Sequence, residues 1–141
     1  MILFLDFDGV LHPLYPTAEL PEFCYLPRLA AVLRDFPRVE IVISSSWRTE
    51  FELEALRAFF PADLQARIIG VTPWLPGSRC EEVLAWLREH RPGSPWLALD
   101  DQPKLWRQTG RLLLCGDGFR EQEEARLRSE LRRSLGYFSQ N

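Results

Sequence analysis

The sequence predicts an α/β protein built on a doubly wound, mainly parallel sheet of five strands, in three layers. Short apolar runs alternate along the chain with segments of helical periodicity, which is the pattern of repeated β-α-β units. The runs are continuously apolar, as expected for strands that are buried on both faces. Acidic or hydroxyl residues directly follow three of the runs, at the sheet edge where such folds bind their ligands.

The first half of the chain sets up this alternation. Residues 2–5 are the first apolar run and predict the first strand. A proline-rich stretch over residues 13–21 predicts irregular structure, because proline removes a backbone donor and disfavours helix before it. Apolar residues then recur at helical spacing over 27–36, and a β-branched strand is predicted over 39–43. A second helix is predicted over 51–60, ending before a proline.

The second half repeats the pattern. Strands are predicted over 67–71, 96–99 and 112–115, and helices over 80–90 and 121–135. The last helix has the clearest ends. Its first turn is rich in Glu and its last turn in Arg, which suits the helix dipole, and a glycine follows it.

Composition limits the class of protein. The 141 residues are 46% hydrophobic and 26% charged, and they predict one globular domain over 1–141. The net charge of −3 provides no general attraction for nucleic acid or for an anionic membrane. Three widely spaced cysteines without a C-x-x-C pair indicate free thiols. With no signal peptide or long apolar run, the chain is expected to be cytoplasmic and to have no membrane partner.

Two aspartates, Asp6 and Asp8, end the first predicted strand and are followed by Gly9. Residues i and i+2 of an extended chain point to the same side, so both carboxyl groups are expected on one face. Glycine then allows a sharp bend. A solvated turn or a calcium loop would also begin in this way, but the spaced acids of a calcium loop do not follow.

Polar residues at two other strand ends are expected to meet this pair. Ser44 and Ser45 follow the second strand, where a hydroxyl can bind a phosphoryl oxygen or cap the next helix. Asp100 and Asp101 follow the fourth strand, and adjacent carboxylates at a buried strand end repel each other without a cation.

These segments resemble the haloacid dehalogenase-like (HAD) phosphohydrolases. The resemblance rests on four motifs in the family's order over residues 6–101: Asp6-Phe7-Asp8-Gly9-Val10-Leu11, then Ser44, then Arg79 near a helix start, then Asp100-Asp101. Each motif is degenerate alone, and the set is specific. Ser44-Ser45-Ser46-Trp47-Arg48 and Gly70-Val71-Thr72-Pro73 make the chain similar to small HAD domains that occur alone in bacteria and inside RNA-repair proteins.

The resemblance implies a Rossmann-like, HAD-like fold and a phosphomonoesterase. By this resemblance Asp6 attacks phosphorus to form an aspartyl-phosphate, and Asp8 protonates the leaving oxygen and later activates water. Ser44 binds a phosphoryl oxygen, although a neighbouring serine fits the same motif. Arg79 neutralises phosphoryl charge and restrains Asp6, and Arg48 is the alternative source of that charge.

The implied cofactor is Mg²⁺, held by Asp6, Asp100 and Asp101 with the backbone carbonyl of Asp8. Ser45 and Arg48 are predicted to contact substrate, although Arg48 could equally stabilise the acidic edge of the sheet.

The motif spacing leaves no room for a folded cap domain, so an open site is expected, edged by residues 14–23. The resemblance favours a nucleotide or a nucleic-acid end as the phosphorylated substrate. Two alternatives remain: a catalytically idle phosphate- or metal-binding domain acting as an interaction module, and a dehalogenase, against which Asp8 argues.

Histidine and tryptophan are assigned no chemistry. His12 is expected to be structural or solvated, and Trp47 to belong to the core rather than to a ligand platform. The same packing role is predicted for Trp74, Trp86, Trp96 and Trp106.

Overall fold

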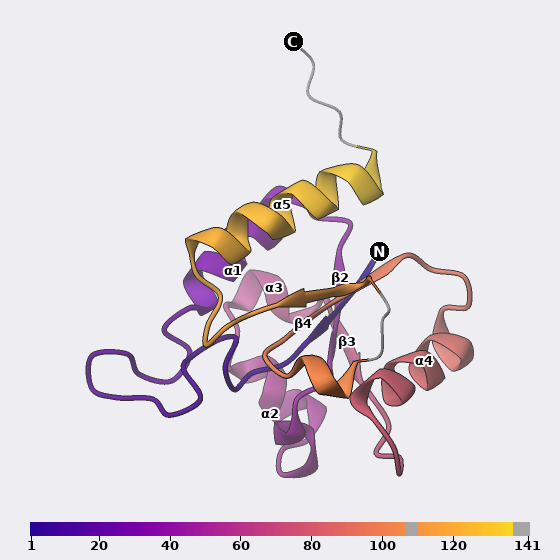
Figure 1. Ribbon diagram of the computed structural model, residues 1–141, viewed down its shortest axis with the longest axis horizontal. Helices are drawn as coiled ribbons and strands as arrows, with labels where there is room; N and C mark the ends of the chain where they lie inside the picture. The colour runs from indigo at the N-terminus through magenta and orange to yellow at the C-terminus, as the bar shows by residue number, and fades with distance from the viewer. Residues whose placement is uncertain (107–109, 137–141) are drawn as a thin grey trace.

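The computed structural model describes residues 1–106 and 110–136 and consists of a parallel sheet between two layers of helices (Figure 1). Its five strands run in the order β3-β2-β1-β4-β5. Their bounds are β1 (Ile2–Leu5), β2 (Glu40–Ile43), β3 (Ile68–Val71), β4 (Trp96–Asp100) and β5 (Leu112–Leu114). The predicted doubly wound, five-stranded fold is confirmed, and no separate cap domain is present among the described residues.

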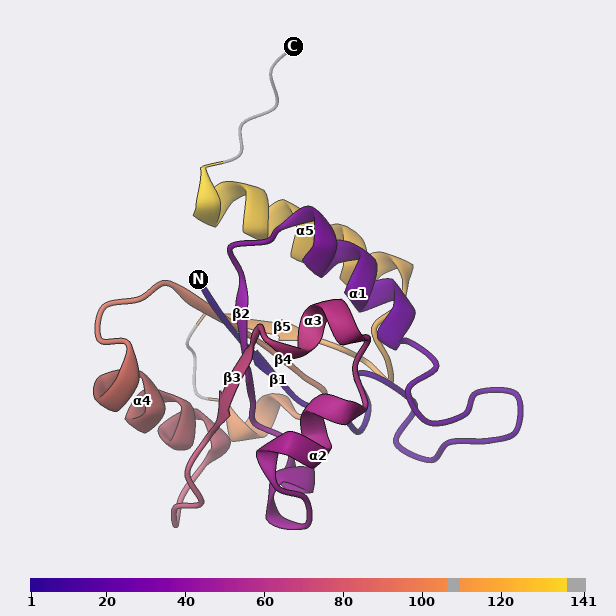
Figure 2. The same cartoon turned by 180° about the vertical axis from the view of Figure 1, so that it is seen from behind.

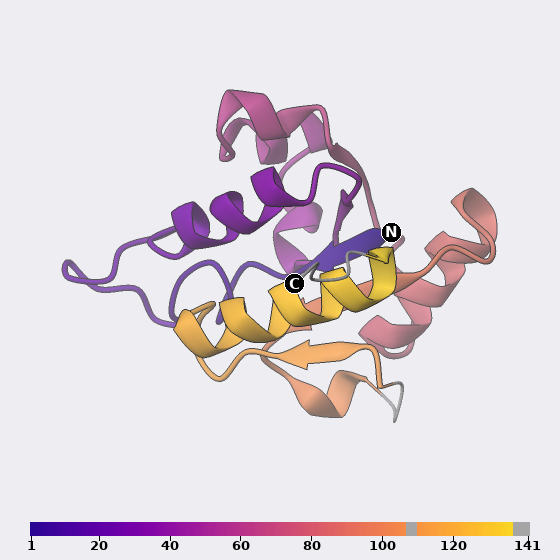
Figure 3. The ribbon, with the colours of Figure 1, turned by 90° about the horizontal axis from the view of Figure 1, so that it is seen from above.

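The helices divide between the two faces of the sheet. One face is covered by α1 (Leu26–Asp35) and α5 (Glu121–Leu135), which lie side by side, together with α2 (Leu53–Ala58) and α3 (Ala62–Gln65) (Figures 2 and 3). The other face is covered by α4 (Arg79–His90). Alternate residues of β1 therefore enter different cores: Leu3 and Leu5 pack beneath α1 and α5, while Ile2 and Phe4 pack against α4.

The helix ends follow the local sequence. Ser78 caps α4 by accepting a hydrogen bond from the backbone N–H of Glu81 at 3.3 Å. Gly136 ends α5 with φ 74°, a left-handed conformation that glycine adopts without steric cost, as the sequence predicted. These caps fix where each helix starts or stops.

The helix predicted over 51–60 is present as α2, and two short helices that were not predicted flank it. These are the 3-10 helix η1 (Ser46–Thr49) before α2 and α3 directly after Pro61. Pro61 ends the predicted helix but also suits the residue before a new one, because its φ of −54° is compatible with a helix start. A further 3-10 helix, η2 (Pro103–Leu105), was not predicted.

Residues 13–24 contain no helix or strand, which includes the stretch 13–21 predicted to be irregular, and they project from the body of the protein beside α1 (Figures 1 and 3). Within the described part of the chain, no helix is both long and apolar enough to span a membrane.

Candidate active site

Three acidic side chains meet at the carboxyl ends of β1 and β4. One carboxylate oxygen from each of Asp6, Asp100 and Asp101 lies within 4.8 Å of the other two. The strands pair in parallel with Leu5 opposite Leu99, so Asp6, directly after β1, and Asp100, the last residue of β4, lie at the same level of the sheet edge. The expected approach of Asp6 to Asp100 is confirmed, although the two lie far apart in the sequence.

The environment of Asp6 and Asp101 disfavours the ionised form of their carboxyl groups. Asp6 is 3% exposed and Asp100 is fully buried. Burial, and then the nearby Asp100, raise the pKa of Asp6 well above its usual value. Burial is also the main cause of the raised pKa of Asp101. The group therefore favours a bound proton or a cation over three separate negative charges.

Arg79 supplies one positive charge. Its Nη1 lies 2.6 Å from Asp100 Oδ2 and 3.3 Å from Asp6 Oδ2. Burial alone would lower the pKa of Arg79, but Asp6 and Asp100 together raise it. The first turn of α4 thus places a permanently charged guanidinium beside the predicted nucleophile.

The same oxygens suit a hard divalent cation. The donor set is entirely carboxylate oxygen, which Mg²⁺ prefers. Asp101 Oδ1 is buried without a hydrogen-bond partner, and a bound cation would satisfy such an oxygen. The side chain of Asp8 does not belong to this group, so its predicted contribution through the backbone carbonyl remains a prediction.

Gly9 is required for this arrangement. Its φ of 77° is a conformation that other residues rarely adopt, and an added Cβ would lie 2.2 Å from Asp101 Oδ2. The glycine of the first motif therefore leaves the space that the third carboxylate occupies.

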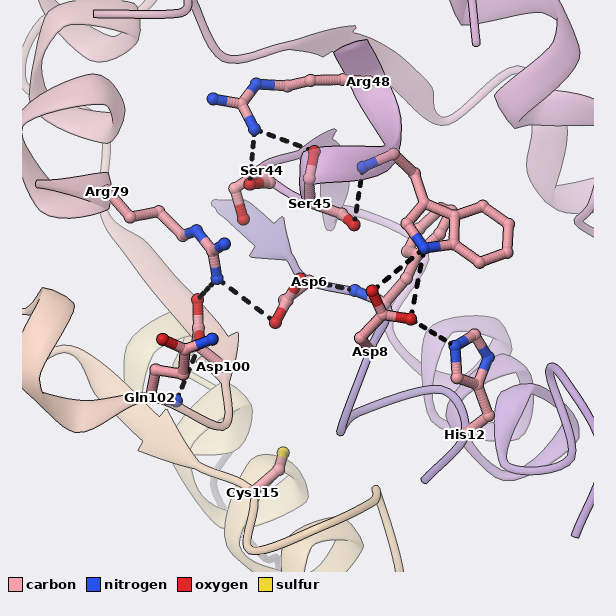
Figure 4. A network of polar contacts seen from close by, with 12 residues as sticks. Asp6, Asp8, His12, Ser44, Ser45, Arg48, Arg79, Asp100, Gln102 and Cys115 are labelled. Carbon is pink, nitrogen blue, oxygen red and sulfur yellow. Dashed lines mark hydrogen bonds and ion pairs between the residues drawn. The ribbon is translucent and has the colours of Figure 1, made fainter. Parts of the chain in front are cut away.

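Two serines follow β2 with different surroundings. Ser44 is fully buried and its hydroxyl has no hydrogen-bond partner. Figure 4 shows this side chain on the side of Asp6 and Arg79, so a phosphoryl oxygen there could become its partner. Ser45 instead accepts a hydrogen bond from the backbone N–H of Trp47 at 3.2 Å and caps η1. Its predicted contact with substrate remains untested.

The guanidinium group of Arg48 makes hydrogen bonds and an ion pair within the protein. It donates to the backbone carbonyls of Thr72, Ser44 and Ser45 at 2.8–3.0 Å, and to that of Pro73 at 3.3 Å. Its Nη2 also lies 2.9 Å from Glu82 Oε2, with the Arg48 side chain only 4% exposed. This arrangement favours the alternative in which Arg48 stabilises the edge of the sheet, since all three guanidinium nitrogens already have partners.

Asp8 has two side-chain partners for which the sequence predicted no such role (Figure 4). Its Oδ1 lies 2.8 Å from His12 Nε2, and both carboxyl oxygens accept from Trp47 Nε1, at 3.2 and 3.1 Å. His12 was expected to be structural or solvated, and the structure shows it fully buried against an acid of the first motif. The spacing of four residues after Asp8, beside a bend, was the only local signal for this contact.

Trp74 is not a packing residue. It is 71% exposed, whereas Trp86, Trp96 and Trp106 are buried as predicted. The Arg48 guanidinium lies 5.3 Å from the centre of the Trp74 ring. A cavity of about 180 Å³ is lined by both Trp74 and Arg79, so the two residues border the same hollow of the surface.

Comparison with known proteins supports the assignment of the four motifs to the HAD family. A search of curated proteins finds no match. The model of one protein family, described as the HAD domain in Swiss Army Knife RNA repair proteins, matches residues 2–123. This match includes all four motifs, from Asp6 to Asp101, and the whole sheet. The chain therefore belongs to this family of HAD domains.

Proposed function

We propose that this protein is a Mg²⁺-dependent phosphomonoesterase that acts through an aspartyl-phosphate on Asp6. The convergence of Asp6, Asp100 and Asp101 beside Arg79 is the observation that supports this most strongly. Carboxyl groups whose charged form is disfavoured by burial, with an arginine beside them, are typical of catalytic sites rather than of solvated turns.

In the proposed reaction Asp6 attacks phosphorus as the bond to the leaving oxygen breaks, and Asp8 gives its proton to that oxygen. The Asp8 carboxylate then removes a proton from the water that hydrolyses the aspartyl-phosphate on Asp6. Arg79 and the Ser44 hydroxyl stabilise the phosphoryl oxygens, whose charge is spread in the transition state. When bound, Mg²⁺ would be held by Asp6, Asp100, Asp101 and the Asp8 carbonyl, and it would neutralise phosphoryl charge.

The proposed substrate is a nucleotide or the phosphorylated end of a nucleic acid. The family description supports this class, and so does the position of Trp74. An exposed indole on which a base can stack lines the same cavity as Arg79. The absence of a strong net positive charge favours contact with one or two nucleotides over a long strand.

A phosphatase screen tests this proposal. The substrates are p-nitrophenyl phosphate, ribose 5-phosphate, nucleoside 3′- and 5′-monophosphates, and oligonucleotides with a phosphate at either end, each with Mg²⁺ or with EDTA. We expect Mg²⁺-dependent release of phosphate and a phosphoenzyme in acid-quenched samples of the wild type. The Asp6→Asn variant should release no phosphate and form no phosphoenzyme. If the wild type binds Mg²⁺ and nucleotides without hydrolysing any ester, the domain is an idle binding module instead.

A further inference from the structure

His12 lies between Asp8 and the irregular segment 13–24. Its ring makes one hydrogen bond on each side: Nε2 lies 2.8 Å from Asp8 Oδ1, and Nδ1 lies 3.0 Å from the backbone nitrogen of Phe23. The ring is fully buried, so water does not compete for either nitrogen. The two contacts together determine which nitrogen has the proton.

The backbone nitrogen of Phe23 always has its hydrogen, so Nδ1 must be the acceptor in that contact. A neutral imidazole has one N–H, which then resides on Nε2 and points to Asp8. A second proton on Nδ1 would face the Phe23 N–H and remove this hydrogen bond. The geometry therefore makes His12 a donor to the Asp8 carboxyl group, with its tautomer fixed by the main chain.

The backbone of Phe23 is held firmly enough to fix that tautomer. Its φ of 62° is unfavourable for a bulky residue. The ring packs with its centre 5.3 Å from that of His12, 5.4 Å from Trp47 and 4.8 Å from Phe59. Strained backbone persists where surrounding contacts determine it, and such positions cluster at functional sites.

The two carboxyl oxygens of Asp8 accept different numbers of hydrogen bonds. Oδ1 accepts from both His12 and Trp47, whereas Oδ2 accepts only from Trp47. Figure 4 shows the Asp8 carboxyl group between Asp6 and His12. Oδ2 therefore has the greater remaining capacity to bind a proton and to meet the leaving oxygen.

We propose that His12 is a positioning residue, which orients Asp8 so that Oδ2 exchanges protons with the leaving group and with water. This inference rests on the proposed acid and base role of Asp8. In the first step the Oδ2 proton moves to the leaving oxygen while the P–O bond breaks and the Asp6–phosphorus bond forms. In the second step Oδ2 takes a proton from water, whose oxygen replaces Asp6 on phosphorus.

Two substitutions at residue 12 separate the two contacts of the ring. In His12→Asn the amide lies near the position of Nδ1, so it can accept from Phe23 but cannot reach Asp8. In His12→Gln the amide reaches the position of Nε2, so it can donate to Asp8 but leaves the Phe23 N–H without an acceptor. Both variants lose the buried ring, which makes each the control for the other's loss of packing.

The readout is kcat/KM for ribose 5-phosphate, a poor leaving group, divided by kcat/KM for p-nitrophenyl phosphate, a good one. Positioning of the acid matters most for the poor leaving group. We expect His12→Asn to lower this ratio at least about tenfold, and His12→Gln to keep it within about threefold of the wild type. Equal losses on both substrates, an unchanged ratio in both variants, or the same fall in both would refute the positioning role.

A second measurement does not depend on activity. Long-range ¹H–¹⁵N correlation spectra of a His90→Gln protein, which keeps only one of the two histidines, report the His12 tautomer directly. We expect a protonated Nε2 and an unprotonated Nδ1 at neutral pH. An Nδ1–H tautomer, or exchange between tautomers, overturns the inference even if the protein is an active phosphatase. The expected tautomer in a protein that hydrolyses no ester leaves the positioning geometry standing and rejects the proposed function.

Discussion

Replacing Arg48 with methionine tests whether this residue supports the fold or binds substrate. The Arg48→Met side chain keeps the length of the arginine stem but removes all of its N–H donors. Four backbone carbonyls and the carboxylate of Glu82 then lose a partner, with the two side chains only 4% and 8% exposed in the wild type. The substitution therefore leaves the buried carboxylate of Glu82 without its positively charged partner.

The expected cost is large for a protein of this size. Removing one member of a buried ion pair destabilises proteins by about 3–5 kcal/mol. Total free energies of unfolding are about 5–15 kcal/mol, so Arg48→Met should lose a substantial fraction of the stability. Burial lowers the pKa of Arg48, although Glu82 opposes this shift, which agrees with a guanidinium held away from water.

Urea unfolding at 25 °C, followed by tryptophan fluorescence, measures this effect. Arg48→Lys is the matched control: it keeps a positive charge for Glu82 but cannot bridge four carbonyls, so an intermediate loss is expected. The double variant Arg48→Met/Glu82→Gln should be more stable than Arg48→Met alone, by about 1–3 kcal/mol, because the unpaired carboxylate is gone. Glutamine retains an oxygen for the Leu75 backbone N–H, which Glu82 accepts at 3.1 Å.

Enzyme kinetics in the same variants test the alternative, in which Arg48 binds substrate. A substrate contact predicts a higher KM with a free energy of unfolding close to that of the wild type. If Arg48→Met unfolds within about 1 kcal/mol of the wild type and raises KM tenfold, the structural reading is wrong, because it requires the larger loss of stability.

Three further predictions concern the carboxylates and the exposed tryptophan. The raised pKa of Asp6 means that the folded, metal-free protein holds this proton more tightly than the unfolded chain does, so this contribution to stability is lost as pH rises through the folded pKa. The stability of Asp6→Asn relative to the wild type in EDTA should thus increase from about pH 4 upward in urea titrations. Gly9→Ala should weaken Mg²⁺ binding measured by calorimetry, because the new Cβ meets Asp101; unchanged affinity would argue against Asp101 as a ligand. Trp74→Ala should lower kcat/KM for nucleoside monophosphates relative to ribose 5-phosphate by about 5-fold to 150-fold, since a stacked base is worth about 1–3 kcal/mol. The control Tyr15→Ala, another exposed aromatic, should not change this ratio.

The sequence was sufficient to predict the sheet and the meeting of its polar strand ends. Apolar periodicity reflects burial on one or two faces, and β1 and β4 are buried throughout. Once parallel pairing is inferred, the residues after each strand must share an edge, which is why Asp6 and Asp100 could be placed together. Arg79 was placed at the site only by the resemblance to the HAD motifs, in which a basic residue lies near a helix start.

Contacts made by loops that fold back onto the site could not be predicted from the periodicity of the sequence. The His12 contact with Asp8 needs Phe23 to return at a left-handed φ, and no local pattern predicts this conformation. Trp74 follows a strand by three residues, where composition alone does not decide between burial and exposure. Pro61 permits both the end of one helix and the start of the next, so the sequence pattern predicted the end of α2 but not the start of α3.

The central position of β1 also has a consequence for how the protein is made. This strand precedes β4 by about ninety residues in the chain, yet both of its edges are paired in the finished sheet. During synthesis one edge of an entirely apolar strand therefore waits for a partner that emerges late, and such an edge can pair with other chains. Asp6, the proposed nucleophile, likewise exists on the growing chain well before Asp100 and Asp101. The candidate site should be completed in a single late step, when β4 docks beside β1. A chaperone that shields β1 until then should raise the yield of folded protein.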